Sequence, residues 1–356
     1  MVSSPSRVAA LVVAFAALLA GGCGASSKSH RLVIHASATP TATRVAAVDP
    51  ATHLVKWHGP AMNIFFHPLV INPVPAFTSD FLGLGFQEYF VTAYEFRRIL
   101  DGLWRNGWTL VDAHDAAAGH VMVPRGRKPL VLSEDDVNYY GYFGGRGLAA
   151  RLVVSRTGQV LAQTHGRHPR TTTEDVVPIV DEFVARHPDF SVGGAKGVLA
   201  ETGYEGLFGY HDLATSKTQR AEVRTLATTL KSDGWLLASH TYGHIDLSHD
   251  SLATIAHDTT EWKRLAEPLI GKTDLLIYPF GARPTAAGAR LLRKAGFPIQ
   301  FDIDVRPIRY RLGGATVMSR LHIDGFAFQD PQRMKQLFSV RRVIDPLRPW
   351  PANFPS

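Results

Sequence analysis

Two histidines, His240 and His244, lie four residues apart in the segment His-Thr-Tyr-Gly-His. On a helical turn this spacing places both imidazoles on one face, where they can bind a divalent metal from one side. Because the chain contains 16 histidines, two surface histidines are an equally acceptable interpretation of the pair alone. A further ligand is needed before the pair indicates a metal site.

Asp135 and Asp136 provide candidate ligands. At the end of a strand the backbone turns, so one carboxylate can bind a metal while the other faces the metal-bound water. Two histidines and one carboxylate leave coordination positions open, as catalytic sites require. Zinc is the default metal for these donors, although cobalt, nickel, iron or manganese fit them too. The alternative is a pair of solvated or helix-capping aspartates.

The polar residues of interest follow apolar runs that look like buried strands. They are Asp135 and Asp136 after 130–132, His240 after 235–238, Tyr278 and Pro279 after 275–277, and Arg320 and His322 after 315–318. In barrels and open α/β sheets the carboxyl ends of strands carry the functional site. Four clusters in equivalent positions favour a common site more than any one of them does.

Three segments with helical patterns end in a glycine that an aromatic residue and an apolar stretch follow: Gly107, Gly234 and Gly296. Glycine permits the left-handed turn that ends a helix. Thr92 and Glu95 form a capping box before the clearest helical stripe. The recurring helix, glycine and buried strand predict parallel α/β architecture, and we expect a distorted or incomplete (β/α) barrel.

The order of the motifs resembles that of the polysaccharide deacetylase (NodB-homology) enzymes of the carbohydrate esterase group. Asp-Asp at 135–136, His-Thr-Tyr-Gly-His at 240–244 and Tyr-Pro-Phe-Gly at 278–281 look like the family patterns Thr-Phe-Asp-Asp-Gly, His-Ser/Thr-x-x-His and Arg-x-Pro-Tyr/Phe-Gly. Ile-Phe-Phe-His-Pro-Leu at 64–69 is similar to the start of the permuted branch that includes the poly-N-acetylglucosamine deacetylases. The resemblance covers about residues 63–325 and implies a barrel of the NodB-homology type.

The resemblance implies a role for each matched residue. Asp136, His240 and His244 would bind the metal, Asp135 would be the general base, His67 would protonate the leaving amine, the Phe280 N–H would stabilise the oxyanion, and Thr241, Tyr278 and Pro279 would support these loops. His322 is a rival for the acid, because it lies in the Leu-x-His context of unpermuted members. The Phe65-Phe66 context favours His67, and a core histidine remains the alternative for each.

Several positions depart from the family pattern. Glu134 stands where the first motif has Phe, and Val137 stands where it has Gly. Ile277 stands where the third motif often has Arg, so the ion pair that orients the base is missing or comes from elsewhere, and Arg320 is a candidate substitute. Asp136 and His240 are 104 positions apart (240 − 136), which predicts an insertion at about 145–211.

The N-terminus looks like an export signal. A run of 13 apolar and small residues, 8–20, follows Arg7 and is shorter than the roughly 20 residues that span a bilayer. Leu-Ala-Gly-Gly-Cys at 19–23 resembles a lipoprotein cleavage site, with a lipid on Cys23. An ordinary secretory signal that leaves an unpaired thiol is the alternative. We expect a signal peptide at 1–22, a flexible tether at 23–53 and a catalytic domain at 54–356.

Composition excludes several classes of protein. Hydrophobic residues are 45% and charged residues 19%, which excludes a mostly disordered chain. The net charge of +7 is spread along the chain, and no zinc-finger spacing or aromatic RNA-binding box accompanies it, so we expect no nucleic-acid partner. The single cysteine excludes an internal disulfide.

The sequence therefore predicts a metal-dependent hydrolase of non-peptide carbon–nitrogen bonds. It would remove N-acetyl groups from an envelope or extracellular polysaccharide that contains N-acetylglucosamine. We expect it at the outer face of the bacterial cytoplasmic membrane through a lipid anchor, or secreted. The alternatives are an inactive glycan-binding scaffold and a deacetylase of O-acetyl or non-sugar amide substrates. Retention of both aspartates and both histidines favours catalysis, because a pure binder needs no base beside a metal.

Overall fold

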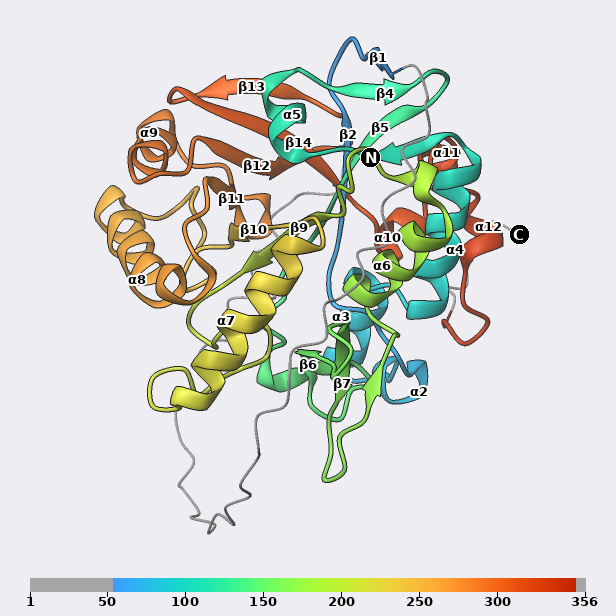
Figure 1. Ribbon diagram of the computed structural model, residues 1–356, viewed down its shortest axis with the longest axis horizontal. Helices are drawn as coiled ribbons and strands as arrows, with labels where there is room; N and C mark the ends of the chain where they lie inside the picture. The colour runs from blue at the N-terminus through green and yellow to red at the C-terminus, as the bar shows by residue number, and fades with distance from the viewer. Residues whose placement is uncertain (1–53, 350–356) are drawn as a thin grey trace. The chain divides into compact units, whose positions relative to one another are not determined.

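The computed structural model describes residues 54–349 (Figure 1). The predicted signal peptide, the tether and Cys23 lie outside the described residues. Within 54–349, no helix is both long enough and apolar enough to span a membrane.

Seven parallel strands close into a barrel. They follow the order β14-β2-β5-β9-β10-β11-β12, and β12 pairs back with β14. The bounds are β2 (Met62–Phe66), β5 (Lys128–Glu134), β9 (Gly197–Glu201), β10 (Trp235–Ser239), β11 (Leu275–Ile277), β12 (Ile299–Ile303) and β14 (Ala315–His322). β3 (Trp108–Leu110) adds to the start of β5, and β13 (Arg309–Leu312) pairs antiparallel with β14. The predicted (β/α) barrel is confirmed, with seven strands in the ring.

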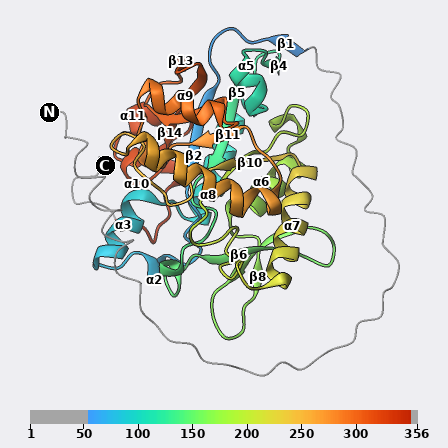
Figure 2. The ribbon, with the colours of Figure 1, turned by 90° about the vertical axis from the view of Figure 1, so that its left-hand side faces the viewer.

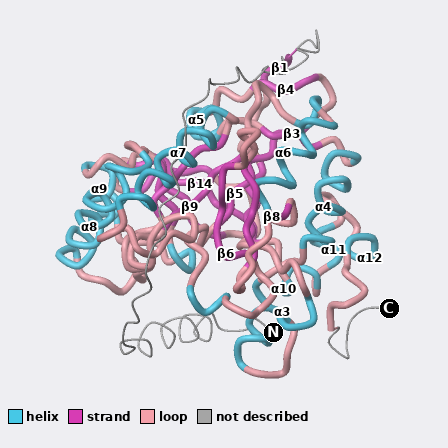
Figure 3. The backbone as a smooth tube through the Cα atoms, turned by 60° about the horizontal axis from the view of Figure 1, so that its bottom comes forward, coloured by secondary structure: helices cyan, strands magenta, loops and turns pink. Residues whose placement is uncertain are grey.

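Helices surround the strands, which gather at the centre in Figure 3. α7, α8 and α9 lie on one side of the barrel, and α4 and α6 lie on the other (Figures 1 and 2). The long helices are α4 (Ala93–Arg105), α6 (Val176–Arg186), α7 (Lys217–Ser232), α8 (Leu252–Ile270) and α9 (Ala286–Lys294). The short ones are α2 (Pro73–Ala76), α3 (Phe81–Tyr89), α5 (Ala113–Ala118), α10 (Gly325–Phe328), α11 (Pro331–Met334), α12 (Val340–Val343) and the 3-10 turns η1 (Gly141–Phe143), η2 (Pro188–Phe190) and η3 (Pro279–Gly281).

The predicted helix signals appear in α4. Thr92 Oγ1 accepts from the Glu95 N–H (3.1 Å), and Glu95 Oε2 accepts from the Thr92 N–H (2.8 Å), so the capping box is complete. The predicted stop glycines Gly107, Gly234 and Gly296 all have positive φ, at 80°, 98° and 111°. Each therefore ends its helix in a conformation that side-chain-bearing residues rarely adopt.

Alternation along the strands separates two apolar clusters. Leu132, Leu199 and Leu237 pack with residues of the surrounding helices. Val131, Val198 and Ala238 belong to a second cluster built from strand residues and small residues of α5. Because side chains alternate along a strand, Ser133 and Asp135 continue the face of Val131, whereas Glu134 continues the face of Leu132.

The chain between β5 and β10 contains both added and barrel elements. A separate three-stranded sheet is formed by β6 (Ala149–Val154), β7 (Val160–Thr164) and β8 (Thr171–Thr172). α6 and the barrel strand β9 follow it. The range predicted as an insertion, about 145–211, thus includes one barrel strand and one outer helix beside the extra sheet. A further two-stranded sheet pairs β1 (Leu54–Lys56) antiparallel with β4 (Met122–Pro124), and several elements separate these two strands in the sequence.

An ion-pair cluster joins the start of α5 to the loop before β11. His114 Nδ1 lies 3.2 Å from Asp112 Oδ1, and His114 Nε2 lies 2.8 Å from Asp274 Oδ1. The hydrogen bond to Asp112, followed by that to Asp274, outweighs burial and raises the pKa of His114 from 6.5 to about 9. The stabilisation of the fold by the protonated His114 is therefore complete below about pH 6.5 and is lost as the pH rises through 9.

We expect His114→Ala to lower the melting temperature near pH 6 and to have no effect above pH 10. The side chains of His114, Asp112 and Asp274 are each 40% to 45% exposed. The loss in the free energy of unfolding should therefore be about 1 kcal/mol or less. Thermal unfolding between pH 5 and 10.5 measures it, with the exposed His168→Ala as control. An equal loss at both ends of this range would show that the ion pairs are not its cause.

Candidate functional site

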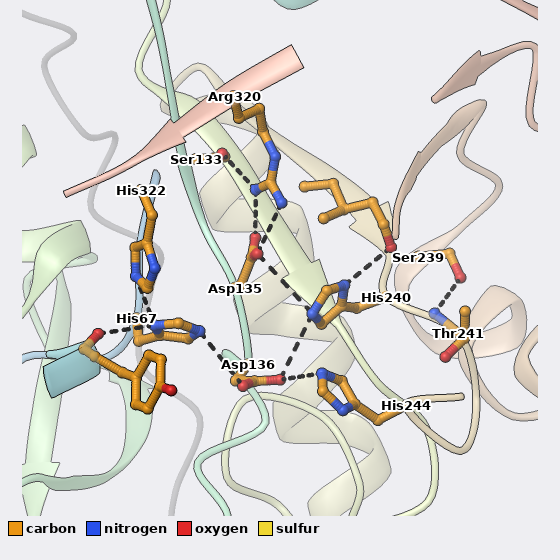
Figure 4. A network of polar contacts seen from close by, with 12 residues as sticks. His67, Ser133, Asp135, Asp136, Ser239, His240, Thr241, His244, Arg320 and His322 are labelled. Carbon is orange, nitrogen blue, oxygen red and sulfur yellow. Dashed lines mark hydrogen bonds and ion pairs between the residues drawn. The ribbon is translucent and has the colours of Figure 1, made fainter. Parts of the chain in front are cut away.

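The strand-end residues meet at one end of the barrel (Figure 4). Asp136 Oδ1 lies 3.6 Å from His244 Nε2 and 3.8 Å from His240 Nε2. The three side chains offer ligand atoms that all lie within 4.8 Å of one another, and they form the one such group of acidic, histidine or cysteine side chains among residues 54–349. Donors bound to one zinc ion at about 2 Å lie roughly 3 to 4 Å apart. The three residues thus fit a single divalent metal.

Hydrogen bonding and burial prepare both histidines as ligands. His240 Nδ1 lies 3.0 Å from the Ile277 carbonyl oxygen, which accepts its proton and leaves Nε2 free toward Asp136. Burial lowers the pKa of His240, and it lowers that of His244 to about 4. Both imidazoles are therefore neutral near pH 7, the state in which imidazole binds a metal.

The histidine pair does not lie on a helix, so that part of the sequence interpretation was wrong. Residues 240–246 form a loop that turns at Tyr242 and Gly243, and Thr241 and His244 in it have φ of 62° and 51°. Asp258 of α8 holds this turn, because its carboxylate accepts from the Tyr242 N–H (2.8 Å) and the Gly243 N–H (2.7 Å). Asp258 was not predicted from the sequence, because it contacts backbone groups 15 and 16 residues away and no local pattern indicates such a contact.

Thr241 supports the same turn. Its Oγ1 accepts from the Ile245 N–H (3.1 Å), and its N–H donates to Ser239 Oγ (3.2 Å). The His240 and His244 rings meet edge to face, with 4.9 Å between their centroids. The Thr241 hydrogen bonds thus stabilise the turn that carries both imidazoles.

Asp135 lies beside the candidate metal ligands and binds Arg320. Arg320 Nη1 donates to Asp135 Oδ1 (2.6 Å), and Nη2 donates to Oδ2 (2.9 Å). Burial alone would raise the pKa of Asp135, but the charges of Arg320 and His240 outweigh it and lower this pKa to about 2. Asp135 Oδ2 lies 4.0 Å from His240 Nε2. An ionised carboxylate therefore lies beside the three candidate metal ligands.

His67 and His322 occupy one side of the site and contact each other. His67 Nε2 lies 3.8 Å from Asp136 Oδ2, whereas His67 Nδ1 lies 3.2 Å from both the Tyr89 carbonyl oxygen and His322 Nε2. His322 Nδ1 in turn lies 2.9 Å from Asp324 Oδ2. Burial, then the neighbouring His322, lowers the pKa of His67 to about 4. His67 is thus the inner residue of the pair and His322 the outer one.

The third motif forms the turn η3 against His244. Phe280 adopts φ 58° and ψ 5°, and its ring centroid lies 4.4 Å from that of His244. The Tyr278 N–H donates to the Phe301 carbonyl (2.9 Å), and the Tyr278 hydroxyl bonds to Gln300. Tyr278 and Pro279 are buried, so they anchor the turn within the barrel wall.

Backbone strain concentrates at this end of the barrel. Of the residues in 54–349, six that are not glycine have positive φ: Asp136, Tyr139, Phe208, Thr241, His244 and Phe280. Four of them are candidate site residues. Such conformations cost free energy and persist where surrounding contacts impose them, often at functional sites. Val137, which stands at the glycine position of the resembled motif, is not among them, whereas the preceding Asp136 has φ 59°.

Glu134 lies on the outer face of the barrel in an acidic cluster. Its side chain is completely buried, as are those of Asp175 and Glu201. Burial, then the charges of Asp175 and Glu201, raises the pKa of Glu134 well above its usual range. Among the described residues neither carboxyl oxygen of Glu134 has a hydrogen-bond partner. Glu134, which departs from the resembled motif, is thus a buried acid whose raised pKa favours the protonated form.

No protein-family model matches the chain, and no curated protein sequence matches it. Solved structures that are similar include the deacetylase PplD from Streptococcus pyogenes in complex with acetate, with 13% identity and a TM-score of 0.48 over 79% of this chain and 99% of that chain. A de-N-acetylase from Aggregatibacter actinomycetemcomitans has 14% identity and a TM-score of 0.45 over 74% of this chain and 95% of that chain. IcaB from Ammonifex degensii has 16% identity and a TM-score of 0.43 over 80% of this chain and 97% of that chain. At these identities the similarity concerns the fold alone.

Proposed function

We propose that this chain is a metal-dependent deacetylase of the polysaccharide deacetylase (NodB-homology) family, which hydrolyses N-acetyl groups of a polysaccharide. The observation that carries the proposal is the pairing of Asp135 with Arg320 beside Asp136, His240 and His244. Hydrolysis of an amide by water at a metal site needs a base beside the metal ligands, and the ionised Asp135 has this position. A binding scaffold has no use for such a base.

Each residue near the metal ligands has a distinct task. A bound divalent metal would polarise the acetyl carbonyl and lower the pKa of its water. Asp135 is placed to accept a proton from the attacking water, and Arg320 orients Asp135 through two hydrogen bonds. The Phe280 N–H, held by η3, stabilises the oxyanion. Zinc is the first candidate for the metal, and cobalt, nickel, iron or manganese suit the same donors.

We assign the general acid to His67 and a positioning role to His322. His67 faces Asp136, whereas His322 contacts Asp324 and reaches the site only through His67. His67 is neutral near pH 7 in the free site, because burial and His322 depress its pKa. Negative charge that develops on the substrate beside His67 favours uptake of a proton from solvent by this imidazole. His67 can then transfer that proton to the amine nitrogen as the carbon–nitrogen bond breaks.

The substrate and the cellular location complete the proposal. We infer an N-acetylglucosamine-containing polysaccharide of the envelope or the extracellular matrix. The chain would reach it by export, with Cys23 carrying a lipid. Cells given a labelled fatty acid test the anchor, because Cys23→Ala should remove the label from the protein.

The test of the activity is acetate release from N-acetylglucosamine oligomers by the purified exported protein. A chelator should abolish release, and zinc or cobalt should restore it with about one metal per chain. Metal binding without acetate release would favour an O-acetyl or non-sugar amide substrate. No metal after reconstitution would favour the glycan-binding scaffold.

A further inference from the structure

We infer that Tyr140 is a positioning residue for the metal ligand Asp136; the inference rests on the proposed metal site. The Tyr140 hydroxyl donates to Asp136 Oδ1 at 2.8 Å. Oδ1 is also the oxygen that lies 3.6 Å from His244 Nε2 and 3.8 Å from His240 Nε2. Tyr140 therefore binds the same carboxylate oxygen that faces both histidines.

The two oxygens of Asp136 have different surroundings. Oδ1 faces the histidines and Tyr140, whereas Oδ2 lies 3.8 Å from His67 Nε2. A carboxylate that can rotate about its Cβ–Cγ bond would exchange these surroundings. The Tyr140 hydrogen bond opposes that rotation, so it keeps one oxygen toward the metal ligands and the other toward His67.

Tyr140 is rigid enough for this role. Its side chain is 3% exposed, and its ring stacks on that of Tyr142 at 5.3 Å and an interplanar angle of 11°. Tyr204 lies 5.7 Å away on another loop, and Phe143 meets the ring edge at 5.8 Å. A hydroxyl on a ring packed on several sides has little freedom to leave its acceptor. Hydrogen bonds of this kind to ligating carboxylates tune metal affinity.

The neighbouring Tyr139 offers a matched control. Its ring is also buried, and its hydroxyl donates to Asp175 Oδ2 at the same distance, 2.8 Å. Asp175 is outside the group that could bind the metal, and it keeps backbone donors from Leu69 and Val176. Tyr139→Phe and Tyr140→Phe thus remove the same atom from adjacent buried rings.

The experiment measures the affinity of the metal-free protein for Zn²⁺ and Co²⁺ by chelator competition, and records the visible spectrum of the Co²⁺ form. Tyr140→Phe should weaken binding by about 10- to 100-fold and change the Co²⁺ spectrum, whereas Tyr139→Phe should do neither. Melting temperatures of the metal-free variants verify that both fold.

Several results would overturn the inference. Unchanged affinity and an unchanged Co²⁺ spectrum in Tyr140→Phe would show that the hydroxyl does not position Asp136. Equal weakening in both variants would indicate general loosening of the loop. Failure of the wild type to bind either metal would instead refute the proposed function, so the two failures are distinguishable.

Discussion

Asp135→Asn should lower kcat/KM for acetate release by about 10³-fold and leave the metal bound. The asparagine side chain has nearly the same shape but cannot accept the proton of the attacking water. Asp136, His240 and His244 are untouched, so metal content should stay near that of the wild type. Acetate assays and metal analysis on the same preparation test both parts.

The control for Asp135→Asn should also replace a buried aspartate that accepts from an arginine, although the Arg283 side chain of the control is 49% exposed. Asp302 is buried and accepts from Arg283 Nε at 2.9 Å, so Asp302→Asn is suitable. We expect it to lower stability but to keep most of the activity. Activity near the wild-type level in Asp135→Asn would refute its role as the base, and similar losses in both variants would attribute the effect to folding.

Arg320→Met should lower kcat/KM at pH 7 by about 10- to 100-fold and shift the acidic limb of the pH profile upward. The Arg320 guanidinium is the largest charge that lowers the pKa of Asp135 against the effect of burial. Its removal therefore raises the pKa of Asp135. Asp135 then takes up a proton at a higher pH and loses its function as a base. The pH dependence of kcat/KM between pH 4 and 9 measures the shift.

The same substitution should also affect folding. Asp135 would be left buried without its partner, which costs about 3 to 5 kcal/mol in the free energy of unfolding. Arg320→Lys serves as a control, because it retains the charge and loses the two-pronged hydrogen bonding. It should recover part of the pH shift. Superimposable pH profiles for wild type and Arg320→Met would contradict the proposed action of Arg320.

Local sequence patterns predicted the barrel and a common site at the strand ends, whereas the choice of Asp136, His240 and His244 as metal ligands came from the resemblance to the deacetylase family. The stop glycines and the capping box reflect preferences of a few consecutive residues. Asp136, His240 and His244 follow apolar runs, and strand ends of a parallel barrel converge. The parallel arrangement of the strands therefore predicts that these three side chains lie close together.

The contacts that orient the ligands could not be predicted in the same way. Asp258 holds the turn after His240 from a helix that begins several residues after the motif, and no local pattern announces that contact. The order of His67 and His322 depends on β2 pairing beside β14 in the closed ring, with Leu321 opposite Ile64. Such contacts follow from barrel closure and register, which local preferences do not determine.

The most direct test of the account is the bound metal per chain in wild type, His240→Ala and His249→Ala. His249 has an 83% exposed side chain in the same loop region, so it controls for loss of a histidine. We expect about one metal ion in wild type and His249→Ala, and loss of metal and acetate release together in His240→Ala. Full metal content and activity in His240→Ala would contradict the assignment of the site.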